Sequence, residues 1–306
     1  MRQQPAGAQR HGAPDDQPWT ALCGPGRIEG RSATSDQLPA GHPFMPFEPT
    51  DPRLLDDAIA IARAAGEAIM PFYRRGADVR LKADASPVTA ADEAADALIT
   101  RALRELTPSI PVVSEESAAQ FGGRAPAGRF WLVDPLDGTK EFIGERDEFT
   151  VNIALIEDTA ALLGVVLLPA RGEVYAGAAG RGAFVVDECG RRPIRCRALP
   201  ADGAVVAVSR SHGDRAADGA LLGGIKVAGE VQAGSALKFC LVARGAADVY
   251  PRAGRTMEWD TAAGQAVLIA AGGNVFDRNG SPLIYGKPGF ENPSFIARGA
   301  AGQGAN

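Results

Sequence analysis

The spacing of apolar residues predicts two helices at the start of the patterned part of the chain. Apolar side chains recur every three or four positions from Leu54 to Met70, which is typical of an amphipathic helix over about residues 51–74. Thr89 is a suitable N-cap for a second helix that reaches about Leu106, because its hydroxyl can accept hydrogen bonds from the first turn. The chain before this region, residues 1–47, is rich in Pro, Gly, Gln and Ser and has no apolar period, so we expect disorder there.

Short apolar runs separated by glycine turns predict a series of strands in the middle of the chain. Phe149 to Leu155 alternates apolar and polar residues, as a half-buried strand does. The other predicted strands cover 110–113, 131–133, 163–169, 173–176 and 182–186. Because the later strands follow one another with only short turns between them, we expect a largely antiparallel meander.

A change of composition at residues 189–203 divides the patterned chain into two halves. Beyond it we predict strands over 204–209 and 247–250, helices over 234–243 and 261–271, and a hairpin-like element over 275–282. The predicted organisation is a disordered extension (1–47), an N-terminal α+β half (48–200), a C-terminal αβα half (201–298) and a disordered tail (299–306).

Composition excludes several classes of function. The net charge is −5 and Lys and Arg form no run, so a nucleic-acid polymer is not an expected partner. The four cysteines form no C-x-x-C pair and have no ligand-like spacing with the three histidines, which argues against a zinc site and favours a reducing cytosol. No stretch approaches the roughly 18 apolar residues of a membrane span.

The densest chemical signal lies just after the apolar run 131–133. Asp134 and Asp137 stand three residues apart, and Pro135 between them is expected to end the pairing of the strand. Two buried carboxylates this close repel each other unless a cation lies between them. The alternative is an Asx-turn with a helix N-cap, which requires one aspartate and not two.

Further carboxylates stand at other predicted strand ends. Glu115 and Glu116 follow the strand at 110–113, and Asp260 precedes the helix at 261–271. Oxygen ligands of this kind suit Mg²⁺, and Gly138 and Thr139 can offer N–H groups to a phosphate at a helix start. Together they predict metal-assisted hydrolysis of a phosphate ester. The plain alternative for the glutamates is an exposed acidic pair.

Four motifs resemble those of the inositol-monophosphatase-like, lithium-sensitive phosphatase superfamily. They are SPVTAADEAAD at 86–96, SEE at 114–116, DPLDGTKEF at 134–142 and WDTAAG at 259–264. The resemblance covers about Leu54 to Arg298 and implies an α/β fold, the layered αβαβα sandwich of inositol monophosphatases and sugar phosphatases. The residues at 140–142, 209–212 and 234–239 are most similar to the bacterial 3′(2′),5′-bisphosphate nucleotidase branch.

The resemblance implies two or three Mg²⁺ ions and a set of ligands for them. Glu115, Asp134 and the Leu136 carbonyl would hold the first ion. Asp134 would bridge to a second ion, held also by Asp137 and Asp260. Glu116 would support the site or bind a third ion.

The same resemblance implies the catalytic and substrate-binding residues. Asp92 and Thr139 would orient the attacking water; from the residues alone, Asp92 is equally explained as an acidic group in the first turn of a helix. The implied substrate contacts are Glu115, Leu136, Asp137, Gly138, Thr139, His212, Ser235, Lys238, Arg252 and Asp260. Without the resemblance, His212 is a surface-loop histidine, Lys238 a solvated lysine and Arg252 a surface arginine.

The expected activity is removal of the 3′-phosphate from adenosine 3′,5′-bisphosphate, a small nucleotide bisphosphate, with the sulfated nucleotide as a second substrate. An inositol or fructose-bisphosphate phosphatase with the same metal site is the alternative enzyme. A non-catalytic regulator or an RNA-associated factor that kept the fold is the alternative from another class. The resemblance implies a cytoplasmic protein, with peripheral attachment to the cytoplasmic face of the inner membrane left open.

Overall fold

The computed structural model describes residues 52–73, 79–81, 87–210 and 214–300. The predicted disordered extension at 1–47 therefore lies outside the described residues. Two residues of the predicted disordered tail are held in place: the Gly299 N–H donates to the Asp248 carbonyl (2.9 Å), and Ala300 forms a bridge with Ala198.

Two amphipathic helices, α1 (Pro52–Ile69) and α2 (Ala90–Leu106), form the outer layer on one side. Their buried residues are spaced mostly four apart, as at Ala91, Ala95 and Ile99 of α2, so each helix presents one continuous apolar stripe. The first helix ends five residues earlier than predicted. A short antiparallel pair, β1 (Val79–Leu81) and β2 (Pro87–Thr89), connects the two helices.

The predicted meander is a seven-stranded sheet in which neighbours in sequence are neighbours in space. Its strands are β3 (Val112–Ser114), β4 (Arg129–Asp137), β5 (Thr150–Glu157), β6 (Ala160–Leu168), β7 (Glu173–Ala178), β8 (Gly182–Asp187) and β9 (Gly190–Ile194). The pair β3 and β4 is parallel and every later pair is antiparallel, as the meander pattern predicted. A 3-10 turn, η1 (Ala118–Phe121), follows β3, and α3 (Thr139–Ile143) follows β4.

The prediction that Pro135 ends the strand was wrong. In β4 Asp134 faces Asn152 and Asp137 faces Thr150, so the β4 side of the ladder holds one residue more than the β5 side. This is a β-bulge, one of the places in a sheet where a proline without an N–H is tolerated. The strand continues through the bulge and carries both aspartates.

The prediction of a half-buried β5 was also wrong. Every residue of β5 except Glu157 is buried, including Thr150 and Asn152 on the polar positions of the alternation. The reason is that β5 has a helix on each face, with α1 packed on one side and α6 (Ala262–Ala270) on the other.

A second, five-stranded sheet has the strand order β11-β10-β12-β14-β13. Its strands are β10 (Ala204–Ser209), β11 (Val227–Ala233), β12 (Val249–Arg252), β13 (Asn274–Asp277) and β14 (Phe295–Arg298). The strands β10, β11 and β12 are parallel, while β14 runs antiparallel to both β12 and β13. The predicted strand at 247–250 is displaced by two residues, and β9, β11 and β14 were not predicted.

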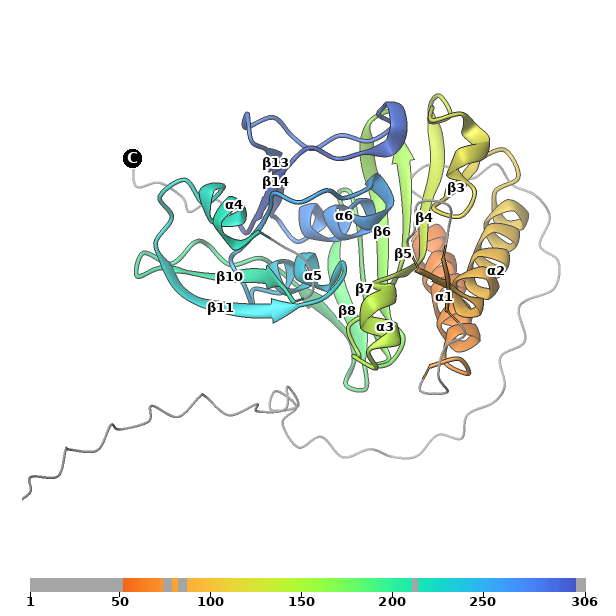
Figure 1. Cartoon of the computed structure of the whole chain (residues 1–306), viewed down its shortest axis with the longest axis horizontal. Helices are drawn as coiled ribbons and strands as arrows, with labels where there is room; N and C mark the ends of the chain where they lie inside the picture. The colour runs from red at the N-terminus through yellow and green to blue at the C-terminus, as the bar shows by residue number, and fades with distance from the viewer. Residues whose placement is uncertain (1–51, 74–78, 82–86, 211–213, 301–306) are drawn as a thin grey trace, which may run out of the picture. The chain divides into compact units, whose positions relative to one another are not determined.

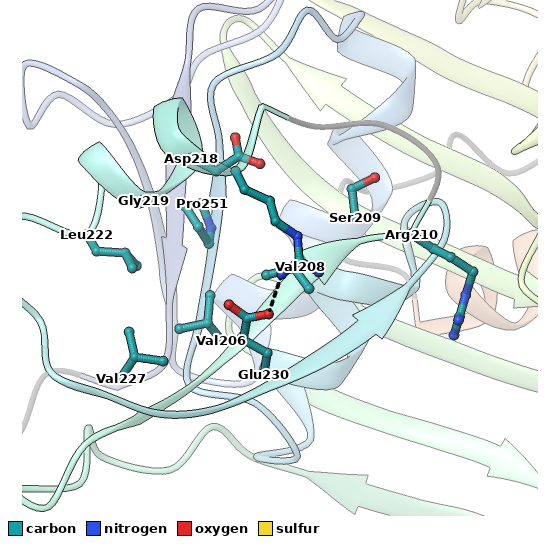
Figure 2. Close-up of a pocket in the computed structure, with 11 residues that line it drawn as sticks. Val206, Val208, Ser209, Arg210, Asp218, Gly219, Leu222, Val227, Glu230 and Pro251 are labelled. Carbon is teal, nitrogen blue, oxygen red and sulfur yellow. Dashed lines mark hydrogen bonds and ion pairs between the residues drawn. The ribbon is translucent and has the colours of Figure 1, made fainter. Parts of the chain in front are cut away.

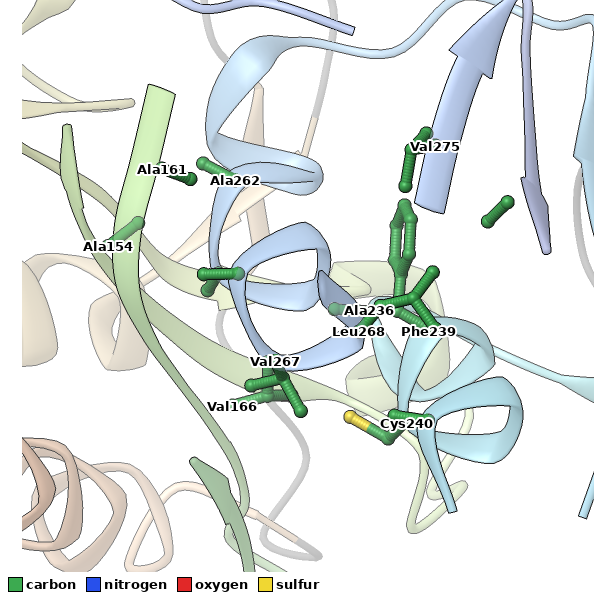
Figure 3. Close-up of a cluster of buried hydrophobic side chains, with 14 of the residues drawn as sticks. Ala154, Ala161, Val166, Ala236, Phe239, Cys240, Ala262, Val267, Leu268 and Val275 are labelled. Atoms are coloured by element: carbon green, nitrogen blue, oxygen red, sulfur yellow. The ribbon is translucent and has the colours of Figure 1, made fainter. Parts of the chain in front are cut away.

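The helices α6 and α5 (Leu237–Ala243) lie between the two sheets (Figure 3). Figure 3 shows Val267 and Leu268 of α6 between Val166 of the larger sheet and Phe239 of α5. Gly164 of β6 allows this approach, because a Cβ there would lie 2.3 Å from the Ala263 carbonyl oxygen. Both helices are buried nearly all round, as expected for an inner layer.

The helix α4 (Arg215–Ala220) packs on the outer face of the second sheet, so the order of layers is helix, sheet, helix, sheet, helix (Figure 1). This confirms the predicted α/β layered class. Two further 3-10 turns, η2 (Glu258–Asp260) and η3 (Pro288–Phe290), complete the described elements. Among the described residues, no helix has both the length and the apolar character needed to cross a membrane.

Candidate active site

The predicted acidic residues come from four different elements that meet at one end of the larger sheet. Glu115 directly follows β3, and its N–H donates to the Val133 carbonyl of β4 (3.0 Å), so the two strand ends lie side by side. Asp134 and Asp137 end β4, and η2, which carries Asp260, packs on β4 and β5. Asp92 lies in the first turn of α2, which packs on β3 and β4.

The mutual proximity of these carboxylates is evident from their electrostatics. Burial, together with the nearby carboxylates of Glu115, Asp137, Asp260 and Asp92, raises the pKa of Asp134 well above its usual value. Burial, with Asp137 and Glu115, raises the pKa of Asp260 to about 8. Because the charge of Asp92 acts on Asp134, we include Asp92 in the acidic cluster. An acidic residue that only complemented the helix dipole would not need to lie near Asp134.

Three of the aspartates each use one oxygen within the protein. Asp134 Oδ1 accepts the Leu136 N–H (3.1 Å), which is the Asx-turn of the alternative interpretation. Asp260 Oδ2 accepts the Met257 N–H (2.8 Å). Asp137 Oδ2 accepts hydrogen bonds from the Ala236 N–H (2.8 Å), Asn152 Nδ2 (3.2 Å) and the Thr150 hydroxyl (3.3 Å).

The other oxygen of each aspartate accepts no hydrogen bond from the residues described. This donor set, carboxylate oxygens with the Leu136 carbonyl beside them, matches what Mg²⁺ or Mn²⁺ prefers. Within the described residues, no three His, Cys, Asp or Glu side chains are grouped so that they could hold a metal ion as they stand.

Gly138 and Thr139 form the corner between β4 and α3. Gly138 has a φ of +90°, in the left-handed region, and precedes the helix, as the sequence predicted. A Cβ at this position would lie 2.1 Å from the Ser235 hydroxyl oxygen. The Ser235 hydroxyl donates to the Asp137 carbonyl (2.9 Å), so the turn that opens α5 rests directly on this corner.

Lys238 is buried, and its interpretation as a solvated lysine was wrong. Its Nζ donates to the carbonyls of Ser235 (2.7 Å) and Ala233 (3.4 Å) and lies over the Tyr250 ring. Burial lowers the pKa of Lys238 to about 8, with the charge of Asp137 opposing this shift and that of Arg252 adding to it. Arg252 is half-buried at the end of β12, so both cations lie near the acidic cluster.

The remaining predicted residues take different positions. Glu116 is half-buried beside Glu115, and its N–H donates to the Ser114 hydroxyl (3.4 Å). His212 lies outside the described residues. The residues that sequence reasoning missed are Thr150 and Asn152, whose polar side chains bond to Asp137. Their only sequence signal was two polar positions in an otherwise apolar strand.

A cavity of about 260 Å³ lies between α4 and the strands β10 and β11 (Figure 2). Val206, Val208 and Leu222 form part of its wall, and Arg215 donates to Glu230 across it (3.1 Å). Ser209 and Arg210, at the end of β10, also line it. No predicted site residue that the structure describes lines this cavity, so it is separate from the acidic cluster.

Comparisons with known proteins agree on one family. The model of the inositol monophosphatase family matches residues 51–303. The 3′(2′),5′-bisphosphate nucleotidase CysQ of Escherichia coli (strain K12) is 49% identical over 249 residues, which cover 79% of this chain and 98% of that protein.

Solved structures give the same result. CysQ from Bacteroides thetaiotaomicron, described as a bacterial member of the inositol monophosphatase family, has a TM-score of 0.69 at 36% identity, covering 82% of this chain and 98% of that one. The IMPase of Thermotoga maritima has a TM-score of 0.66 at 26% identity, covering 80% of this chain and 92% of its own.

Proposed function

The chain belongs to the inositol monophosphatase family, and from that premise we propose that it is a phosphoric monoester hydrolase acting on adenosine 3′,5′-bisphosphate. The products are AMP and inorganic phosphate. The sulfated analogue, 3′-phosphoadenosine 5′-phosphosulfate, is a second substrate. The observation that carries the proposal is the 49% identity to a 3′(2′),5′-bisphosphate nucleotidase over 98% of that relative's length.

The acidic cluster is the proposed reaction centre. Glu115, Asp134 and the Leu136 carbonyl would hold one Mg²⁺, and Asp134, Asp137 and Asp260 would hold another, with Glu116 supporting them or binding a third. Bound Mg²⁺ supplies Lewis-acid stabilisation of the phosphate and eases ionisation of water. The buried carboxylates with raised pKa values support this assignment, because burying several negative charges together is costly without a cation.

The chain's own residues orient the reactants. Asp92 and the Thr139 hydroxyl orient the attacking water, and the Thr139 hydroxyl relays its proton to the Asp92 carboxylate. The N–H groups of Gly138 and Thr139, at the start of α3, donate to the scissile phosphate. Water adds to phosphorus, the bond from phosphorus to O3′ breaks, and O3′ leaves as the ribose hydroxyl after taking a proton from solvent water.

Lys238 and Arg252 are the proposed binding residues for the second phosphate of the substrate, the one that is not cleaved. Lys238 Nζ donates two hydrogen bonds to backbone carbonyls, and an ammonium group has three N–H donors. In this proposal the third N–H of Lys238 and the Arg252 guanidinium bind the phosphate that is not cleaved. Ser235 and His212 complete the proposed nucleotide contacts. The cytoplasmic location, lithium sensitivity and place in sulfur metabolism belong to the same proposal.

A substrate panel tests this function. Phosphate release is measured from adenosine 3′,5′-bisphosphate, inositol 1-phosphate and fructose 1,6-bisphosphate, with Mg²⁺ and with added Li⁺. We expect the nucleotide to be turned over with the highest kcat/KM and Li⁺ to inhibit. Equal or better turnover of inositol 1-phosphate contradicts the nucleotidase assignment, and no release from any substrate contradicts the enzyme assignment.

Two variants refine the result. Asp137→Asn should abolish turnover while circular dichroism shows the fold unchanged. Arg252→Gln should raise the KM for adenosine 3′,5′-bisphosphate but leave that for adenosine 3′-monophosphate, which lacks the second phosphate, unchanged. An equal loss on both nucleotides would show that Arg252 does not bind the uncleaved phosphate.

A further inference from the structure

Arg210 belongs to the 209–212 motif, and the proposed reaction gives it no role. It follows β10 directly, and its guanidinium forms a two-point contact with Glu148. Arg210 Nε donates to Glu148 Oε2 and Nη2 donates to Oε1, both at 2.9 Å. Planar paired contacts of this kind fix geometry as well as charge.

Glu148 is a buried carboxylate that the reaction also does not use. It lies two residues before β5, and its side chain is buried. Besides Arg210, it accepts the Gly234 N–H at Oε2 (2.9 Å) and lies 3.6 Å from Arg171. Burial by itself would raise the pKa of Glu148, but the hydrogen bonds and charge of Arg210, with the Gly234 N–H and Arg171, lower it. The pair is therefore a charged one.

The pair holds the turn between β11 and α5, which we define as residues 233–236. Arg210 Nη2 also donates to the Gln232 carbonyl (3.2 Å), and the Arg210 N–H donates to the Ala233 carbonyl (3.3 Å). Gly234 has no room for a side chain, because a Cβ would lie 2.7 Å from Glu141 Cγ and 3.2 Å from Glu148 Cβ. The next residue of the turn, Ser235, has a positive φ of 48°.

The far side of the same turn contacts a proposed metal ligand. The Ala236 N–H donates to Asp137 Oδ2 (2.8 Å), and the Ser235 hydroxyl donates to the Asp137 carbonyl (2.9 Å). A continuous set of hydrogen bonds thus runs from Arg210 through Glu148 and the turn to Asp137. Displacing the turn moves the donors that orient the Asp137 carboxylate.

We propose that Glu148 and Arg210 are positioning residues that hold the 233–236 turn so that Asp137 presents its second oxygen to the divalent cation. The inference rests on the proposed function, since it assigns the pair a role at the same metal site. According to this proposal, Arg210 binds the carboxylate of Glu148 and does not bind a phosphate of the substrate.

The test is Mn²⁺ binding to the metal-free full-length chain without substrate, followed by electron paramagnetic resonance of the free ion. Arg210→Gln and Glu148→Gln should each weaken Mn²⁺ binding about tenfold, as partners of metal ligands do. Because the two residues act as one unit, the double variant should lose no more than either single one. Adenosine 3′,5′-bisphosphate turnover should require correspondingly more Mg²⁺ in these variants.

A matched control lies at the other end of the same pair of strands. Arg129 of β4 contacts Glu157 of β5 at 2.6 Å, in register and away from the acidic cluster. Glu157→Gln removes a charge from an ion pair just as Glu148→Gln does, and it should leave Mn²⁺ binding unchanged. Thermal midpoints are recorded for every variant, and binding is measured well below the lowest of them.

The outcomes separate this inference from the function beneath it. If the wild type and Asp137→Asn bind Mn²⁺ equally, the metal site itself is wrong. If Asp137→Asn loses binding while Arg210→Gln and Glu148→Gln keep wild-type affinity, the positioning role is wrong. If Arg210→Gln raises only the KM for the nucleotide, Arg210 contacts substrate and the positioning role is again wrong.

Discussion

The carboxylate of Asp137 is held in place by hydrogen bonds from the protein to one of its two oxygens. One of its oxygens accepts three hydrogen bonds, from Ala236 N–H, Asn152 and Thr150. Donors on one oxygen fix the plane of the carboxylate, so the direction of the other oxygen is set before any cation binds. This preorganisation avoids a reorganisation cost when the metal enters.

A residue-scale prediction concerns Gly138, where an added Cβ would displace the Ser235 hydroxyl. Gly138→Ala should break the contact of Ser235 with the Asp137 carbonyl and lower kcat/KM about a hundredfold, as small misplacements at a reaction centre do. The free energy of unfolding should also fall by more than the roughly 1–2 kcal/mol of left-handed strain. Steady-state kinetics and urea unfolding measure the two effects.

Gly190→Ala supplies the control for strain alone. Its φ of +89° matches the +90° of Gly138, yet no atom lies within 4 Å of its added Cβ. This variant should lose only about 1–2 kcal/mol and keep its activity. If both variants lose equal stability and equal activity, the contact with Ser235 is unimportant.

The residues of the site were only partly predictable from the sequence. The carboxylates were identified because paired acidic groups after apolar runs are unusual. Asn152 and Thr150 were missed because alternation along one strand does not reveal whether the polar face meets solvent or a second layer. The burial of Lys238 could not be predicted for the same reason, since it depends on the distant strand that carries Tyr250.

At the scale of elements, two of the strands that the sequence missed, β11 and β14, pair with segments that are distant in the chain. The exposed, alternating β11 and the four-residue β14 have weak patterns of their own. Both become strands because β10 and β12 offer them edges. Pro135 is the opposite case. It was expected to end β4, but β4 continues to pair with β5 on both sides of the bulge that contains the proline.

An element-scale prediction concerns Asp248, which precedes β12. Its carboxylate accepts hydrogen bonds from Arg197 Nε (2.6 Å) and Nη2 (2.8 Å) and from the Val205 N–H of β10 (2.7 Å). Asp248→Asn should lower the free energy of unfolding by about 2 kcal/mol at pH 7, since hydrogen bonds to charged groups are worth about 1.5–3 kcal/mol and Arg197 is partly exposed.

The pH dependence of this effect has a definite sign. Burial raises the pKa of Asp248, but Arg197 and the Val205 N–H outweigh it, so the folded pKa lies below the usual value of 3.8. The stabilisation is therefore present above about pH 4 and is lost as pH falls through the folded pKa. Urea unfolding at pH 7 and at a series of pH values below 3.8 should show wild type and Asp248→Asn converging as the pH falls. A constant difference would rule out the charge as its origin.

At the scale of the whole molecule, the acidic cluster combines Asp134 and Asp137 of the larger sheet with Asp260 of η2, far along the chain. Because these residues come together only in the folded protein, cation binding and folding are coupled. The pKa of Asp260 is raised to about 8 by burial, Asp137 and Glu115. Between about pH 4 and 8 the metal-free folded chain therefore binds more protons than the unfolded chain, and its stability falls as pH rises.

Metal should reverse this loss. The difference between the thermal midpoints with Mg²⁺ and with EDTA should be larger at pH 8.5 than at pH 5.5, because protons compete with the cation at low pH. Differential scanning fluorimetry at the two pH values measures it. Asp260→Asn should shrink the difference. A midpoint difference that is independent of pH would contradict the coupling.

The layered architecture was the most predictable feature, because several spaced motifs in one order specified a family fold. The chain leaves the larger sheet at Ile194 and enters the smaller one at Ala204. Sequence alone could not give the placement of the 233–236 turn against Asp137, which arises only when the two sheets are packed on the shared helices.

The position of β14 has a consequence for how the chain acquires this structure. The larger sheet can assemble strand by strand in the order of synthesis, because each strand pairs with the one before it. The smaller sheet cannot, since β14, the last strand described, lies between β12 and β13 and pairs with both. When the nascent chain has not yet reached Phe295, all strands of the larger sheet are present, but β12 and β13 of the smaller sheet are not yet joined by β14. The edges of β12 and β13 that β14 will cover are therefore exposed during translation.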